Sequence, residues 1–154
     1  MKIMGKFDFG NGPVPAHRHR NPDGTEGGWV ADTATVAETA TVEKDARVFG
    51  NARVFGNSQV YGEARVFGSA HVSGDAWVSV EAKVFDSAQV FDDTWISSKA
   101  QVYGEAQVYG SARVSGKAKV FGNARISRDE KISGDQKISG TALPVCSAQS
   151  VLGW

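Results

Sequence analysis

The feature that most constrains this chain is a six-residue repeat that runs without insertion through most of its length. Every sixth residue from Val30 to Ile138 is valine or isoleucine, which makes nineteen consecutive hexads. The residue four places later is alanine in fifteen hexads, and the other four carry Ser58, Thr94, Glu130 and Gln136. Such regularity predicts a solenoid, in which each repeat buries its apolar face only by stacking on its neighbours.

The hexad 52–57 (Ala-Arg-Val-Phe-Gly-Asn) shows the expected local structure. Its first four residues alternate in character, which is typical of a strand that buries one face, here Ala52 and Val54. Glycine followed by Asn, Asp or Ser then forms a tight corner. A hairpin would reverse the chain and break the identity of successive hexads. The sequence therefore predicts an all-β, single-stranded parallel β-helix with no α-helix.

The number of residues per coil follows from the outward positions, because like side chains should stack on like. A spacing of 18 residues puts five aromatic residues in one column, aligns Trp77 with Trp95, and collects a basic column of Arg47, Arg65, Lys83, Lys119 and Lys137. A spacing of 12 mixes aromatic residues with serine. We therefore predict a triangular coil of 18 residues, and about six coils that form a rod of roughly 30 Å.

The repeat divides the chain into three segments. Residues 30–143 form the predicted β-helix, and residues 1–29 and 144–154 flank it. Because open solenoid ends expose strand edges and apolar cross-sections, we expect both flanks to act as caps. Trp154 is a candidate plug for the last coil. The N-terminal segment either covers the first coil or reaches a neighbouring subunit.

Charge and composition limit which partners and which cellular location we expect. The chain has 17 basic and 17 acidic residues, so no global field favours nucleic acid or an anionic membrane. The basic column lies beside Asp45, Glu63, Glu81 and Asp135, which predicts solvated salt-bridge ladders. Cys146 is the single cysteine, and no apolar leader or membrane-spanning stretch is present. We expect a cytoplasmic protein that binds neither nucleic acid nor membrane.

The hexads resemble those of the hexapeptide-repeat left-handed β-helix proteins, in which a small residue follows an aliphatic one by four places. The resemblance covers about three quarters of the chain and implies a left-handed winding. Enzymes of that family tend to have glycine directly after the aliphatic residue, whereas here that position is mostly aromatic or serine and glycine follows it. The pattern is most similar to uncharacterised hexapeptide proteins of bacteria and their phages, and more weakly to the filament-forming bactofilins.

The resemblance also implies two enzyme hypotheses, and both depend on histidine. γ-Class carbonic anhydrases hold zinc with three histidines at a subunit interface, and hexapeptide acyltransferases use a histidine as general base. His71 is the one histidine of the repeat region, while His17 and His19 precede it. No insertion interrupts the hexads to wall a pocket. We therefore favour a protein that is not an enzyme, without metal or cofactor, and keep both enzymes as alternatives.

Aromatic columns are the main functional signal. A large apolar patch is rarely tolerated on a monomer, and aromatic residues are enriched at protein interfaces. The rings either stack along the rod or contact another protein, and we expect a homodimer or homotrimer. The candidate interface residues are Phe49, Phe67, Phe85, Tyr103 and Phe121, with Phe55, Phe91, Tyr109, Trp77 and Trp95 on the next face.

These observations favour a non-enzymatic interaction protein that presents a rigid aromatic and charged face to a protein partner. The resemblance implies an origin in a phage or mobile element, for example as an inhibitor of a host system. A hexapeptide acyltransferase-like or γ-carbonic-anhydrase-like enzyme is the alternative. A filament-forming structural protein is the third possibility.

Overall fold

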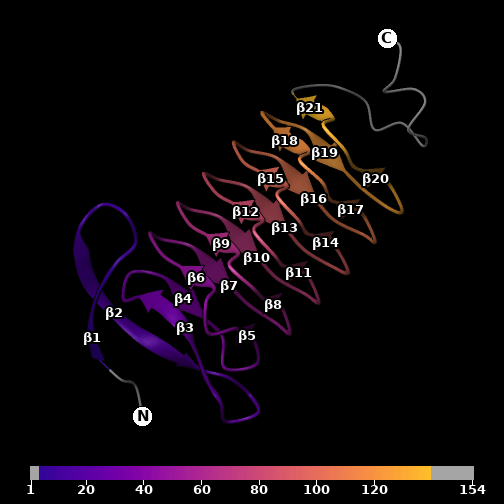
Figure 1. Ribbon diagram of the computed structural model, residues 1–154. Coiled ribbons are helices and arrows are strands. Elements are labelled where there is room, and N and C mark those ends of the chain that lie inside the picture. Colours follow the sequence, from indigo (N-terminus) through magenta and orange to yellow (C-terminus); the bar gives the residue numbers. More distant parts are fainter. Residues whose placement is uncertain (1–3, 140–154) are drawn as a thin grey trace.

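The computed structural model describes residues 4–139, which form an all-β rod without α-helix (Figure 1). A hairpin of β1 (Met4–Asp8) and β2 (Pro13–Arg20) precedes the rod. Three sheets of short strands form the faces of the rod, which we call faces A, B and C. The predicted β-solenoid is therefore confirmed.

Each face takes every third strand in chain order. Face A contains β3 (Glu26–Ala31), β6 (Arg47–Val48), β9 (Arg65–Val66), β12 (Lys83–Val84), β15 (Gln101–Val102), β18 (Lys119–Phe121) and β21 (Lys137–Ser139). Face B contains β4 (Thr35–Val36), β7 (Arg53–Val54), β10 (His71–Val72), β13 (Gln89–Val90), β16 (Gln107–Val108) and β19 (Arg125–Ile126). Face C contains β5 (Thr41–Val42), β8 (Gln59–Val60), β11 (Trp77–Val78), β14 (Trp95–Ile96), β17 (Arg113–Val114) and β20 (Lys131–Ile132).

Pairing between coils has the predicted register. Val30 pairs with Val48 and Val48 with Val66, all in parallel, so successive coils are 18 residues apart and about six coils are stacked. Backbone hydrogen bonds repeat with the same step, since Arg47 N–H donates to Ala64 at 3.0 Å and Phe49 N–H donates to Val66 at 3.0 Å. Each coil is thus the template for the next.

The inward valines and alanines form one continuous core. Val48, Val66 and Val84 have no solvent exposure, and neither do the alanines that precede them. Two inward positions are polar and fully buried, and their hydroxyls donate to the carbonyl three residues earlier. Ser58 bonds to Phe55 and Thr94 to Phe91, each at 2.6 Å. Burial costs little here because both hydroxyls are hydrogen-bonded.

Glu130 and Gln136 replace alanine at inward positions near the last coil. Their side chains turn back onto their own corners: Glu130 Oε1 accepts a bond from Ser127 N–H at 2.8 Å, and Gln136 Oε1 accepts one from Ser133 N–H at 2.9 Å. Both residues are half-buried. These longer side chains are accommodated because they satisfy corner amides that alanine leaves free.

The N-terminal hairpin extends face A and covers part of the first coil. Strand β2 pairs antiparallel with β3, so the edge of that strand is not open. Asn21 Oδ1 accepts a hydrogen bond from Val42 N–H at 2.9 Å, and His19 Nε2 bonds to the Ala40 carbonyl oxygen at 2.8 Å. These two side chains thus form hydrogen bonds with backbone groups in and just before β5 that a preceding coil would otherwise bond. The predicted C-terminal cap at 144–154, including Trp154, lies outside the described residues.

Corners require a backbone with positive φ, which glycine adopts most readily. Gly62 has φ of 62°, and a Cβ at this position would lie 3.0 Å from the Val80 carbonyl oxygen of the next coil. Val80 stands at the same corner position with φ of 64°. A β-branched residue in this region is a steric outlier. Val80 is therefore strained where glycine would not be.

Val84→Asp should abolish folding. The substitution places an unpaired carboxylate at a position with no solvent exposure, at a cost of several kcal/mol. Circular dichroism and thermal unfolding measure the effect, and Lys83→Ser on the outward side of the same strand is the control. A native melting temperature for Val84→Asp would contradict the assigned register.

Val80→Gly should stabilise the protein by up to about 1 kcal/mol, because relief of the positive-φ strain exceeds the entropy lost through a more flexible unfolded chain. Urea unfolding at low protein concentration measures the change. Ser79→Gly, which is not at a positive-φ position, is the control and should destabilise. A lower stability of Val80→Gly would show that the corner is not strained.

Candidate functional site

An unbroken aromatic ladder follows the strands of face A. The rings of Phe49, Phe67, Phe85, Tyr103 and Phe121 stack with centroids 4.8 to 5.2 Å apart and planes within 7° of parallel. The N-terminal hairpin extends the ladder, since Phe9 stacks on Phe49 at 4.7 Å. One residue per 18-residue coil projects from the same point, so the spacing of the coils sets the spacing of the rings.

Stacking leaves the ring edges, rather than the ring faces, to contact another molecule. Each inner ring has neighbours above and below, and all five rings are half-buried. The expected open apolar patch is therefore smaller than the sequence suggested. Ring edges carry a partial positive charge, so this ladder favours oxygen acceptors and apolar side chains at its outer surface. Flat bases or sugars have no free ring face on which to stack inside the ladder.

The other five candidate aromatics do not share one face, so that expectation was wrong. Phe55, Phe91 and Tyr109 follow strands of face B, where Phe91 and Tyr109 stack at 5.2 Å. Trp77 and Trp95 lie on face C and stack at 4.9 Å. Phe55 and Trp95 are the two exposed members of the ten, at 37% and 43%.

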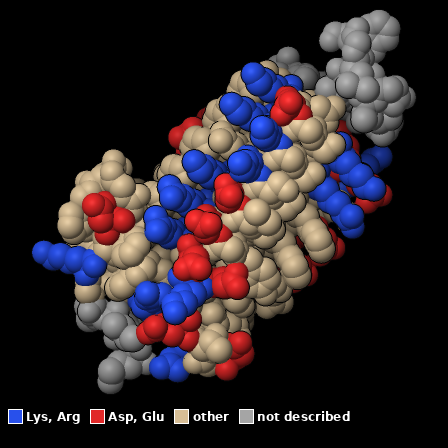
Figure 2. Space-filling view, viewed as in Figure 1, with Lys and Arg blue, Asp and Glu red and all other residues tan. Residues whose placement is uncertain are grey.

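A column of cations runs beside the ladder on face A. The five cations pair in register along six coils, with the neutral Gln101 between Lys83 and Lys119. They are Arg47, Arg65, Lys83, Lys119 and Lys137. Figure 2 shows Lys and Arg side chains in a row along the rod, with Asp and Glu beside part of it. Four of the five cations are two residues before a ring of the ladder, so cation and ring project from the same face; Lys137 precedes Ser139 instead.

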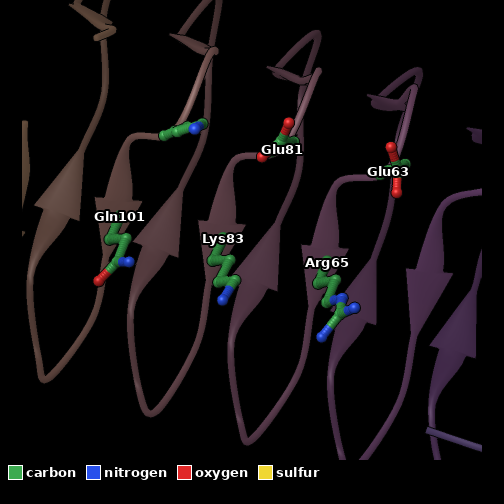
Figure 3. Close-up of a pocket in the computed structure, with 6 residues that line it drawn as sticks. Glu63, Arg65, Glu81, Lys83 and Gln101 are labelled. Carbon is green, nitrogen blue, oxygen red and sulfur yellow. The ribbon is translucent and has the colours of Figure 1, made fainter. Parts of the chain in front are cut away.

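The predicted salt-bridge ladders are not formed. Among residues 4–139, the one ion pair within 4.0 Å is His17–Asp32. Glu63 and Glu81 lie at the corner between faces C and A, while Arg65 and Lys83 point away from them across a shallow hollow of about 350 Å³ (Figure 3). The corner bend separates the two columns, although they are only two residues apart. The cations therefore have no carboxylate partner among the described residues, and the Arg47 guanidinium lies 5.1 Å from the Phe7 ring centre.

The three histidines are in different environments. His17 Nδ1 lies 2.8 Å from Asp32 Oδ1, beside a groove of about 710 Å³ between the hairpin and the first coil. His19 is buried against Ala40, and His71 lies in β10 between Arg53 and Gln89. In the part of the chain that is described, no three potential metal ligands come together. Within one copy, the three histidines therefore lie apart from one another.

Sequence reasoning missed the His17–Asp32 pair. The two residues are 15 positions apart, on either side of the loop between β2 and β3, and become neighbours because β2 folds back antiparallel along β3. The repeat pattern begins at Val30 and contains no information about that reversal. The available clue was the turn sequence Asn21-Pro22-Asp23-Gly24, which lies between the extended segments 13–20 and 26–31.

Comparison with known proteins supports the β-solenoid class that the three stacked sheets define. The family described as "YdcK Beta solenoid repeat" matches residues 46–62, 58–74 and 100–116, each about one coil long. No curated protein and no solved structure matches the chain. The chain is a β-helix repeat protein. None of the described residues forms a helix that could cross a membrane.

Burial lowers the pKa of His19 below its usual value of 6.5, although the hydrogen bond to Ala40 partly opposes the shift. The folded state therefore favours the neutral imidazole. Its contribution to stability is complete above pH 6.5 and is lost as the pH falls from there through the lowered folded-state pKa.

His19→Gln should weaken this pH dependence. The glutamine amide can donate to the same carbonyl but does not titrate, so the variant should lose less free energy of unfolding than the wild type between pH 7.5 and 5.5. Urea unfolding at both pH values measures the difference, and His71→Gln on the open face is the control. Equal pH profiles for wild type and His19→Gln would contradict a buried neutral imidazole.

Proposed function

We propose that this chain is a non-enzymatic binding protein whose face A engages an acidic surface of a protein partner. The supporting observation is the pair of parallel columns on this face: a ladder of ring edges beside a row of cations that have no carboxylate within ion-pair distance. Ring edges and cations both favour carboxylate and carbonyl oxygens. A continuous backbone ladder holds these groups rigid, which reduces the entropy lost on binding.

Carboxylates beside the cation column favour a protein over nucleic acid as the partner. Asp45, Glu63 and Glu81 border the cation column in the N-terminal half of face A, and they would repel a continuous row of phosphates. A protein surface can place single carboxylates opposite single cations. The stacked rings also exclude bases from between them, unlike the free aromatic platforms of single-strand binding proteins.

The resemblance to hexapeptide-repeat proteins and the composition add three expectations to this proposal. The resemblance supports a left-handed winding and an origin in a phage or mobile element, where a rigid acidic-surface binder would suit an inhibitor of a host system. The third expectation, a cytoplasmic location, comes from the composition with its single cysteine. The proposal of a face A binder does not depend on any of them.

Capture from a bacterial lysate tests the proposal. We expect immobilised wild-type protein to retain a specific partner that Phe85→Ser/Tyr103→Ser loses and that high salt elutes, because screening weakens contacts between charged surfaces. Phe91→Ser/Tyr109→Ser removes one stacked pair from face B and is the matched control. Retention by the face A variant, with folding intact, would refute the role of the ladder.

One observation favours the enzyme alternative. A carboxylate that orients an imidazole beside a groove is an arrangement used for general base catalysis, and His17 and Asp32 have it. Acyl-thioester turnover or carbon dioxide hydration that is lost in His17→Ala would establish this alternative. The third possibility, a filament, predicts open-ended polymers in light scattering.

A further inference from the structure

We propose that face C is a self-association surface on which two copies of the chain pack antiparallel. The inference goes beyond the proposed binding function and does not depend on it, because it uses another face of the rod. Three features of face C carry it: an apolar centre, a strained exposed valine, and opposite charges in the two halves.

The apolar centre lies at the middle of face C. Six strands form this face, and the two central ones, β11 and β14, carry Trp77 and Trp95. Their rings are stacked with an interplanar angle of 1°, and Trp95 remains 43% exposed. Tyr61 contacts the Trp77 ring on one side, and the Arg113 guanidinium lies 5.3 Å from the Trp95 ring centre on the other. Tryptophan, tyrosine and arginine are the residues most enriched at the energetic centres of protein interfaces.

Val80 adds an exposed aliphatic group to this centre. It follows β11 by two residues and is 53% exposed, although its positive φ makes valine unfavourable there. Its side chain thus contributes strain without being fully buried within the chain. Strained residues concentrate at functional surfaces, and a partner that covers Val80 would recover its burial energy.

Charge divides face C and its corner with face A into two halves. The N-terminal half has a net charge of −3, from Glu43, Asp45, Glu63 and Glu81 with Lys44. The C-terminal half has a net charge of +3, from Lys99, Arg113, Lys117 and Lys131 with Asp135. The division falls between β11 and β14, at the apolar centre. A second copy in the reverse direction therefore has the complementary pattern.

A two-fold axis in the interface plane, perpendicular to the rod and between β11 and β14, relates the two copies. It places Trp77 of each copy opposite Trp95 of the other, Glu81 opposite Lys99, and Glu63 opposite Lys117. Like charges meet at two places, Asp45 with Asp135 at the outer ends and Asp75 with Asp93 at the corner with face B. All four side chains are exposed, so solvent screens them. A parallel dimer would instead place Glu63 against Glu63 and Lys117 against Lys117. Complementarity therefore selects the antiparallel arrangement.

Face A cannot associate with itself in this way. Its cation column is basic in both halves of the rod, so Arg65 of one copy would lie near Lys119 of the other. Packing through face C leaves the aromatic ladder and the cation column of face A outside the interface. Because face C is narrow, we expect the dimer to dissociate on dilution and at high salt.

Charge reversal at Glu63 and Lys117 tests both the surface and the direction. These residues are three coils apart in one chain, roughly 14 Å, so they cannot pair within it. Sedimentation should show a dimer dissociation constant raised about tenfold for Glu63→Lys and for Lys117→Glu. The contact between positions 63 and 117 occurs twice in a symmetric dimer, and each change makes both copies of it repulsive. An equimolar mixture of the two variants should recover a dimer that contains one copy of each. Glu105→Lys, on a different corner, is the matched control and should dimerise like the wild type.

A wild-type chain that stays monomeric at all concentrations would overturn the proposal. Unchanged dimerisation of either single variant would exclude face C, and failure of the mixture to recover a dimer would exclude the antiparallel direction. Both substitutions are at exposed positions, and circular dichroism verifies the fold of each variant. Trp95→Ser should also weaken the dimer. Partner capture by face A should persist in the charge variants, which separates failure of this inference from failure of the proposed binding function.

Discussion

The parallel backbone ladder between successive coils is the interaction on which the rest of the structure depends. In each coil, the N–H groups of residues whose side chains face outward donate to carbonyls 17 residues further along, as in the bonds from Arg47 to Ala64 and from Phe49 to Val66. This step makes residues 18 apart into direct neighbours. The core, the ladders and the charged columns are all consequences of that one register, because every position of a coil is stacked on its equivalent.

Stacking of equivalent positions gives each face its own chemistry. On face A it brings five rings into contact and aligns the cations beside them. On face C it pairs two tryptophans at the centre and separates acidic residues from basic ones. The same constraint limits what a face can bind, because stacked rings offer edges rather than faces. A rod of this kind presents fixed rows of groups instead of an enclosed pocket.

Regular parts of this protein were predictable, and the irregular parts were not. The period of 18, the inward positions of Val84 and Ala82, and the alignment of Trp77 with Trp95 follow from the repeat and are confirmed. The salt-bridge ladders were predicted wrongly, because adjacency in sequence does not reveal that the corner turns Glu63 away from Arg65. The ring edges were also missed, since the sequence shows which residues form a column but not how their planes are oriented.

By itself, the sequence determined the class of fold, the register of the coils and which residues point inward. These properties depend only on alternation and on a six-residue period, which the chain repeats nineteen times. Tertiary structure alone decided the hairpin that joins face A, the contact between His17 and Asp32, and the turn of Glu130 and Gln136 onto their own corners. Those features occur where the repeat begins or fails. There the geometry is set by unsatisfied backbone groups at the ends of the stack rather than by a pattern in the sequence.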